Sequence, residues 1–229
     1  MSETGFRDRL ARVGEVIDAR RRAGGWQHEV LIVAVTKTHG AEAVRMAAQA
    51  GLRAVGENRV QEAVTKQEAT AGLAIAWHLI GTLQRNKARH AVGRFDLIHS
   101  VDRLDLAREL DRRVPPASQQ AVLVQVNCSA EPQKGGVEPS ELLPLLDALR
   151  DCGNLAVSGL MTMAAYDAPE ADVRRSFASL RTLADDGRAA GHHLPHLSMG
   201  MSDDYAWAVE EGATVVRLGT ALFGPRPHA

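Results

Sequence analysis

Eight short apolar segments recur along this chain at nearly even spacing, and they constrain the fold more than any other feature. The first, VLIVAVTK at 30–37, is continuously apolar and β-branched, as expected for a strand buried on both faces. The starts of the eight segments lie about 26 residues apart on average, close to the length of one parallel β-crossover-β unit. The other seven segments lie at 52–57, 75–81, 95–101, 121–127, 155–161, 196–200 and 214–219.

The intervening segments have helical patterns. AEAVRMAAQA at 41–50 ends at Gly51, which is typical of a helix end. Ser202, followed by two aspartates, is typical of a helix start, and Gly212 would close that helix. Apolar residues recur at helical spacing over 102–114, 138–150 and 169–190, and a further helix is expected before the first strand, over about 3–22.

Strands that alternate with helices predict an α/β fold, and a count of eight predicts a (β/α)8 TIM barrel. We expect a single domain over 1–229, with an extra N-terminal helix. An open doubly wound sheet is the alternative, but no GxGxxG pattern follows the first strand. The seventh segment, HLSMG, is the shortest of the predicted strands.

Composition and charge exclude several classes of function. The formal net charge is −1 and aromatic residues make up only 4%, which argues against nucleic-acid binding and against an anionic membrane surface. The N-terminus lacks the apolar stretch of a signal peptide, and no apolar segment approaches the length of a membrane span. We therefore expect a cytoplasmic protein whose two cysteines stay reduced, and a monomer, because no long apolar stripe is left over beyond the barrel helices.

A cluster of histidines does not indicate a metal. His192, His193 and His196 lie close together in the sequence, but no carboxylate lies at ligand spacing beside them. We therefore expect no metal site.

The first predicted strand ends on a lysine. In a TIM barrel the active face lies at the carboxyl ends of the strands. Val33 and Val35 share the side of the strand on which Lys37 lies, so all three are expected to point into the barrel. A partly desolvated lysine is nucleophilic and suits Schiff-base chemistry, whereas the alternative is a lysine that extends into solvent.

The ends of the last two strands are typical of a phosphate site. TIM barrels often bind phosphate in the loops after strands seven and eight. Gly200 allows close backbone approach, and Ser202 would begin a helix whose free N–H groups attract an anion. Gly219 and Thr220 offer the same on the other side. The alternative is that these residues only cap helices and form turns.

Barrel closure would bring these features together. Strand eight neighbours strand one in a closed barrel, so Lys37 would lie beside the candidate phosphate site together with Arg217. A reactive lysine, a phosphate cradle and a partner for the pyridine nitrogen are what pyridoxal 5′-phosphate (PLP) requires. Asn58, after the second strand, would either project into the barrel mouth or cap the next helix.

At these residues the chain resembles the pyridoxal phosphate homeostasis protein family, the single-domain relatives of the alanine racemase barrel. The resemblance covers about residues 30–224, although the family usually has a proline shortly after the lysine and this chain does not. It is carried by LIVAVTK, GENRVQE, WHLIGTLQRNK, IHSVD, VNCSAEPQKGG, SGLMTM and LSMGMSDDYAWAVEEGATVVRLGTALFG.

The resemblance implies a role for nine residues. Lys37 would hold PLP as an internal aldimine, Arg217 would face the pyridine nitrogen, and Asn58 would lie beside the ring. The phosphate would be held by Ser202, Gly219 and Thr220, with Ser198, Met199 and Gly200 lining that side.

The resemblance also implies a carrier that binds, buffers and delivers PLP, with apo PLP enzymes and free amino acids as candidate partners. The alternative is a PLP-dependent amino-acid racemase or another weak amino-acid enzyme. Two-base racemisation needs a second base, which in the racemases comes from a C-terminal β-domain of the partner subunit, whereas only residues 220–229 follow the last predicted strand here. A sugar-phosphate barrel enzyme using Glu57 and His78 is a third hypothesis, and a second PLP site at Lys134 is left open.

Overall fold

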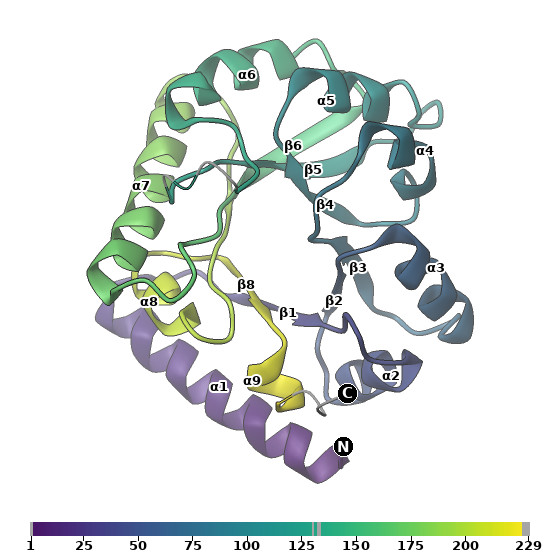
Figure 1. The fold of residues 1–229 in the computed structure, drawn as a ribbon, viewed down its shortest axis with the longest axis vertical. Coiled ribbons are helices and arrows are strands. Elements are labelled where there is room, and N and C mark those ends of the chain that lie inside the picture. The colour runs from purple at the N-terminus through teal and green to yellow at the C-terminus, as the bar shows by residue number, and fades with distance from the viewer. Residues whose placement is uncertain (1, 130, 132–133, 226–229) are drawn as a thin grey trace.

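A computed structural model describes residues 2–129, 131 and 134–225. All eight predicted strands form, and they pair in chain order as one closed, fully parallel barrel (Figure 1). The predicted (β/α)8 barrel is therefore confirmed. The strands are β1 Leu31–Val35, β2 Ala54–Glu57, β3 Ala76–Leu79, β4 Leu97–Val101, β5 Gln120–Gln125, β6 Leu155–Met161, β7 His196–Ser198 and β8 Val215–Leu218.

Helices surround the barrel, and the extra N-terminal helix is present (Figure 1). A one-turn helix after β8, α9, had no counterpart among the predicted helices. None of the described helices is both long and apolar enough to cross a membrane. The helices are α1 Glu3–Ala23, α2 Ala41–Gln49, α3 Val60–Ala69, η1 Arg85–Lys87, α4 Ala88–Ala91, α5 Leu104–Asp111, η2 Pro139–Glu141, α6 Leu142–Leu149, α7 Glu170–Ala189, α8 Tyr205–Glu210 and α9 Thr220–Phe223.

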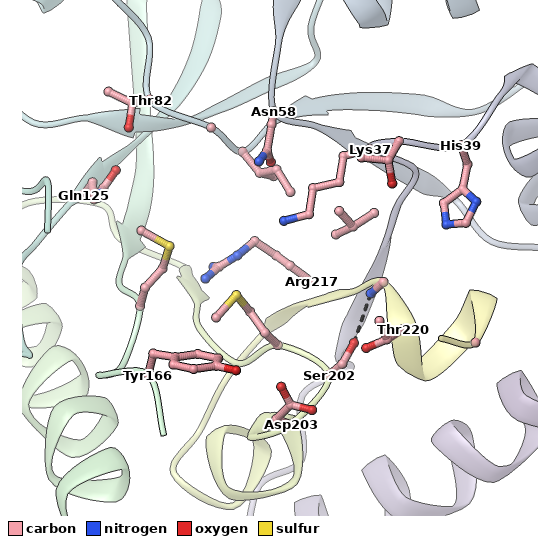
Figure 2. A pocket seen from close by; sticks show the side chains of 18 residues that line it. Lys37, His39, Asn58, Thr82, Gln125, Tyr166, Ser202, Asp203, Arg217 and Thr220 are labelled. Carbon is pink, nitrogen blue, oxygen red and sulfur yellow. Dashed lines mark hydrogen bonds between the residues drawn. The ribbon is translucent and has the colours of Figure 1, made fainter. Parts of the chain in front are cut away.

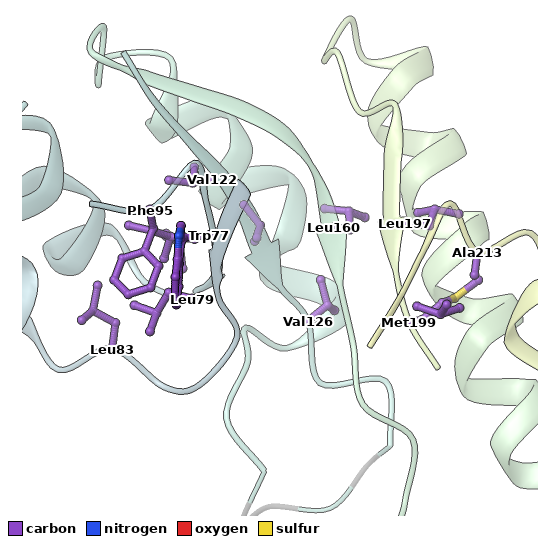
Figure 3. Packing of buried hydrophobic residues seen from close by; sticks show 14 of the residues in the cluster. Trp77, Leu79, Leu83, Phe95, Val122, Val126, Leu160, Leu197, Met199 and Ala213 are labelled. Carbon is purple, nitrogen blue, oxygen red and sulfur yellow. The ribbon is translucent and has the colours of Figure 1, made fainter. Parts of the chain in front are cut away.

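The main apolar core lies between the strands and the surrounding helices. Alternate residues of each strand point outward into it, as Trp77 and Leu79 of β3 do beside Phe95 (Figure 3). The barrel interior differs, because its apolar residues form two separate small clusters around Val33 and Leu123. Buried polar side chains, among them His78, His99, Ser198 and Arg217, occupy other positions of the barrel strands.

Closure of the barrel brings the two ends of the strand series together. β1 pairs in parallel with β8 over four residue pairs, from Leu31 opposite Val215 to Ala34 opposite Leu218. Arg217 of β8 therefore lies directly opposite Val33 of β1. The loop that follows β1 and the loop that follows β8 share one edge of the barrel, as the sequence predicted.

Helix α1 supports the segment after β8. Its buried face carries Phe6, Val13 and Ile17, and it packs on α8 and α9. The Phe6 ring lies 5.2 Å from the Phe223 ring, measured between centroids, and Arg9 Nε donates to the Leu222 carbonyl at 2.6 Å. The N-terminal helix therefore fixes the position of α9 at the barrel mouth.

Replacing Phe6 by alanine should lower the free energy of unfolding by about 3–5 kcal/mol, because the ring is fully buried and its loss leaves a cavity. Urea unfolding followed by circular dichroism measures this. Arg7→Ala is the matched control, since the Arg7–Glu3 ion pair is exposed on both sides and its loss should cost less than about 1 kcal/mol. Equal losses in the two variants would contradict the packing role of Phe6.

Candidate functional site

A cavity of about 510 Å³ opens at the carboxyl ends of the strands (Figure 2). This volume is within the range of small-molecule sites. Loops after six of the eight strands contribute to it. Six of the nine predicted site residues line it: Lys37, Asn58, Ser202, Arg217, Gly219 and Thr220.

Lys37 reaches into this cavity from the loop after β1. Val33 lies in a cluster inside the barrel and Val35 lines the cavity, so the predicted inward side of β1 is confirmed. The Lys37 side chain is partly buried and extends toward Arg217 (Figure 2). The next residue, Thr38, has a φ of 67°, a left-handed conformation uncommon outside glycine, so the chain turns sharply after the lysine.

A buried ion pair holds the residue before Lys37. Lys66 Nζ, on α3, donates to Glu57 Oε1 at 2.6 Å and to the Thr36 carbonyl at 2.8 Å. The Thr36 hydroxyl also donates to Glu57 Oε1. Glu57 is fully buried and Lys66 nearly so. Glu57 was expected only as a possible acid or base, and Lys66 was not predicted. A lysine on the buried face of the helix that follows the strand of Glu57 is the sequence signal for this pair.

The prediction that Ser202 begins a helix is wrong, because α8 starts at Tyr205 with Asp204 as its N-cap. The Ser202 hydroxyl instead accepts hydrogen bonds from the N–H groups of Gly219 at 3.2 Å and Ala221 at 3.1 Å (Figure 2). These N–H groups belong to the first turn of α9. Two N–H groups and a hydroxyl thus converge on one place at the cavity wall, as a phosphate oxygen would require.

Arg217 forms one wall of the cavity and is only 4% exposed. Its Nη1 donates to the Ser198 carbonyl at 2.9 Å and to the Ser198 hydroxyl at 2.7 Å, and its Nη2 donates to the Thr162 carbonyl at 2.9 Å. Burial lowers the pKa of Arg217 to about 10, so the guanidinium stays positively charged at neutral pH. One side of the guanidinium is therefore fixed by the protein.

Three of the predicted site residues do not line the cavity. The Ser198 side chain is buried against Arg217. Met199 points into the outer core beside Ala213 (Figure 3). Gly200 has a φ of 92° and its carbonyl accepts from the Arg217 N–H at 3.0 Å, while a Cβ at this position would lie 2.6 Å from the Ala208 Cβ. Ser198 and Gly200 therefore contact Arg217 from outside the cavity, and Met199 packs in the core behind them.

Asn58 lines the cavity, and its helix-capping interpretation is wrong because the N-cap of α3 is Arg59. Its backbone lies so close to Gly81 that a Cβ there would be 2.3 Å from the Asn58 carbonyl oxygen. Glycine at position 81 therefore allows the loops after β2 and β3 to meet at the cavity.

Several lining residues were not predicted, because most lie in loops without a periodic pattern and one, Gln125, is the last residue of β5. They include Thr82, Gln125, Met163, Met201 and Tyr166, of which Tyr166 is 87% exposed at the rim. His39 also lines the cavity, and its ring packs against Phe223 at 5.0 Å between centroids. The lining thus combines apolar and aromatic side chains with amide and hydroxyl groups.

The cavity combines three kinds of chemistry. A primary amine can condense with an aldehyde, a guanidinium can donate to an aromatic ring nitrogen, and converging N–H groups can hold a phosphate. These groups come from the loops after β1, from β8 and from the start of α9, respectively. The residues present therefore fit a phosphorylated aromatic aldehyde.

Comparison with known proteins agrees with this arrangement. Residues 16–227 match the family model described as "Alanine racemase, N-terminal domain". The "Pyridoxal phosphate homeostasis protein" of Aquifex aeolicus is 45% identical over 224 residues, which cover 96% of this chain and 98% of that protein. The chain belongs to the pyridoxal phosphate homeostasis protein family. The predicted resemblance is therefore confirmed.

Two solved structures have the same barrel fold as this chain. PipY of Synechococcus elongatus, in a structure with PLP bound, superposes with a TM-score of 0.83 at 39% identity, covering 96% of this chain and 100% of that chain. An alanine racemase of Clostridium difficile in complex with cycloserine superposes with a TM-score of 0.80 at 14% identity, covering 98% of this chain and 60% of the racemase. The second comparison establishes a shared barrel fold.

Replacing Lys66 by methionine should destabilise the protein by about 3–5 kcal/mol, because Glu57 would keep a buried charge without its partner. Urea unfolding measures the loss. Lys87→Met, at a surface position of η1, should change stability by less than about 0.5 kcal/mol. Adding Glu57→Gln to Lys66→Met should recover part of the loss, and a double variant less stable than Lys66→Met would contradict the pairing.

Proposed function

We propose that this family member binds PLP covalently at Lys37 and acts as a carrier that buffers the cofactor and delivers it to apo-enzymes. The observation that supports this most strongly is that Lys37, Arg217 and the Ser202–Gly219 cradle meet in one cavity of about 510 Å³. PipY, which is 39% identical and has the same fold, holds PLP in its solved structure.

Each lining residue has a task in this proposal. When bound, PLP supplies an aldehyde that condenses with an amine and releases water. Lys37 provides that amine, and Arg217 donates toward the ring nitrogen. The Ser202 hydroxyl, the Gly219 N–H and Thr220 hold the phosphate. Asn58 lies beside the ring, while Ser198, Met199 and Gly200 support the wall from behind.

The open rim of the cavity favours a carrier over an amino-acid enzyme. Tyr166, Asn58 and Thr220 are exposed at the rim, so water and incoming amines can reach Lys37 and exchange with it. Arg217 is a cation, which disfavours a proton on the ring nitrogen and makes the ring a weaker electron sink; because the racemases share this arginine, it limits side reactions and does not argue against racemisation. The Aquifex aeolicus relative reported above is called a homeostasis protein. A single domain over 1–229, a monomeric state and a cytoplasmic location stay predictions.

Wild-type protein mixed with PLP should develop a visible absorption band, and Lys37→Ala should lose it completely, because the amine that binds the aldehyde is gone. Absorbance spectra after removal of unbound PLP measure this. Lys87→Ala is the control and should keep the full band. A band that survives in Lys37→Ala but is lost when Lys134→Ala is added would move the attachment site to Lys134.

Loaded wild-type protein should reactivate an apo PLP enzyme faster than the spontaneous release of PLP allows. The measurement compares the reactivation rate with the rate at which a PLP scavenger drains the same protein. Equal rates would contradict delivery. The racemase alternative is tested separately, by deuterium uptake at the α-carbon of L-alanine in D₂O, and uptake above that of free PLP would favour an amino-acid enzyme.

A further inference from the structure

A chain of buried polar contacts crosses the inside of the barrel beneath the cavity. Arg217 Nη1 donates to the Ser198 hydroxyl at 2.7 Å, and that hydroxyl lies 2.9 Å from His99 Nδ1. His99 Nε2 in turn lies 3.0 Å from His78 Nδ1. We call Arg217, Ser198, His99 and His78 the cross-barrel bridge.

The bridge connects strands that are not neighbours in the sheet. Ser198 is on β7 and His99 is on β4, and among the described strands β4 pairs with β3 and β5. The contact between them therefore spans the barrel interior. The adjoining strand residues Trp77, Leu79 and Ile98 point outward into the main core, which leaves the two histidines facing inward.

The hydrogen-bond donors and acceptors of the four side chains are compatible with one continuous chain. Arginine has no acceptor, so the Ser198 hydroxyl must accept from Arg217. A neutral imidazole carries one donor and one acceptor nitrogen, so neutral His99 and His78 can complete the chain in either direction. Each of the two contacts of His99 then pairs one donor with one acceptor. No bridge atom named here is left without a partner by this arrangement.

The electrostatics of the site keep both rings neutral. Burial is the main reason that the pKa of His99 lies well below its usual value, and the neighbouring His78 and Arg217 lower it further. Burial likewise lowers the pKa of His78 to about 4, against an opposing effect of Asp96 and with a further lowering by His196. The bridge therefore carries its positive charge on Arg217.

Of these contacts, the one between His99 and Ser198 controls the geometry at the cavity. A serine side chain has three staggered rotamers about its Cα–Cβ bond, and its hydrogen-bond partners select among them. His99 is such a partner, and the fixed hydroxyl is one of three acceptors that orient the Arg217 guanidinium. Loss of His99 would let Ser198 turn away and would loosen Arg217 at the cavity wall.

We infer that His99 is a positioning residue, which fixes Ser198 and thereby aims the Arg217 guanidinium at the ring nitrogen of bound PLP. This inference rests on the proposed function, because it assigns a purpose to Arg217 in holding that cofactor. The inference extends the PLP site by one fully buried residue, His99, which lies across the barrel interior from Ser198.

The test uses the full chain loaded with PLP carrying ¹⁵N at the ring nitrogen. The ¹⁵N chemical shift reports whether that nitrogen is protonated and hydrogen-bonded, and the PLP release rate is measured in parallel. His99→Leu removes both ring contacts. His99→Asn keeps an amide about where Nδ1 lies, so it can still bond Ser198 while it loses His78. His90→Leu, on the exposed face of α4, is the control.

We expect His99→Leu to release PLP about tenfold faster, as for the loss of one hydrogen bond that supports a charged group, and to move the ¹⁵N shift toward the protonated form. His99→Asn and His90→Leu should stay within about twofold of wild type. Ser198→Ala should match His99→Leu, and the double variant should be no worse than either, because both remove the same link.

Several outcomes would overturn the inference. A wild-type shift and release rate in His99→Leu would do so, and so would equal losses in His99→Leu and His99→Asn, since packing alone would then explain both. If His99→Leu fails to fold, the comparison of Ser198→Ala with His99→Asn decides in the same way. If wild-type protein takes up no labelled PLP, the proposed function fails as well, which separates that result from a failure of His99 alone.

Discussion

The pairing of β1 with β8 is the interaction on which the rest of the structure depends. It joins the first and the last strand of the barrel and sets Arg217 opposite Val33. Without this pairing the lysine after β1 and the N–H groups of α9 would lie at opposite edges of an open sheet. Closure thus turns residues separated by about 180 positions in the chain into one wall of a cavity, and it also encloses the space that the cross-barrel bridge fills.

The sequence was sufficient for the architecture because eight short, mainly apolar segments at even spacing match the strands of a closed parallel barrel. It was also sufficient for Lys37, whose side of β1 follows from the two-residue period through Val33 and Val35. It failed for α9, which is one turn long and too short to show a helical period. The same two-residue period shows why Ser198 and Met199 could not both line the cavity, since adjacent residues of a strand point to opposite faces.

Contacts across the barrel lay beyond the reach of a single sequence. His78 and His99 each lie within a mainly apolar segment, where the sequence alone does not distinguish a core histidine from a functional one. Their contact with each other and with Ser198 depends on which strands face one another through the interior, and on the register of each strand. Lys66 is similar, because its partners Glu57 and Thr36 come from two different strand ends. A sequence pattern shows which residues share one face of a strand, whereas barrel closure determines which strands face one another across the interior.

The dependence of the site on α9 has a consequence for biosynthesis. The N–H groups that meet Ser202 belong to residues 219 and 221, which follow all eight strands, and α9 is held in place by α1 at the other end of the chain. The cradle is therefore assembled only after the ribosome has released the segment up to Phe223 and the N-terminal helix has docked against it. A nascent chain that has passed Lys37 but not yet reached α9 lacks these N–H groups, so the complete cavity wall forms only once α9 has been synthesised.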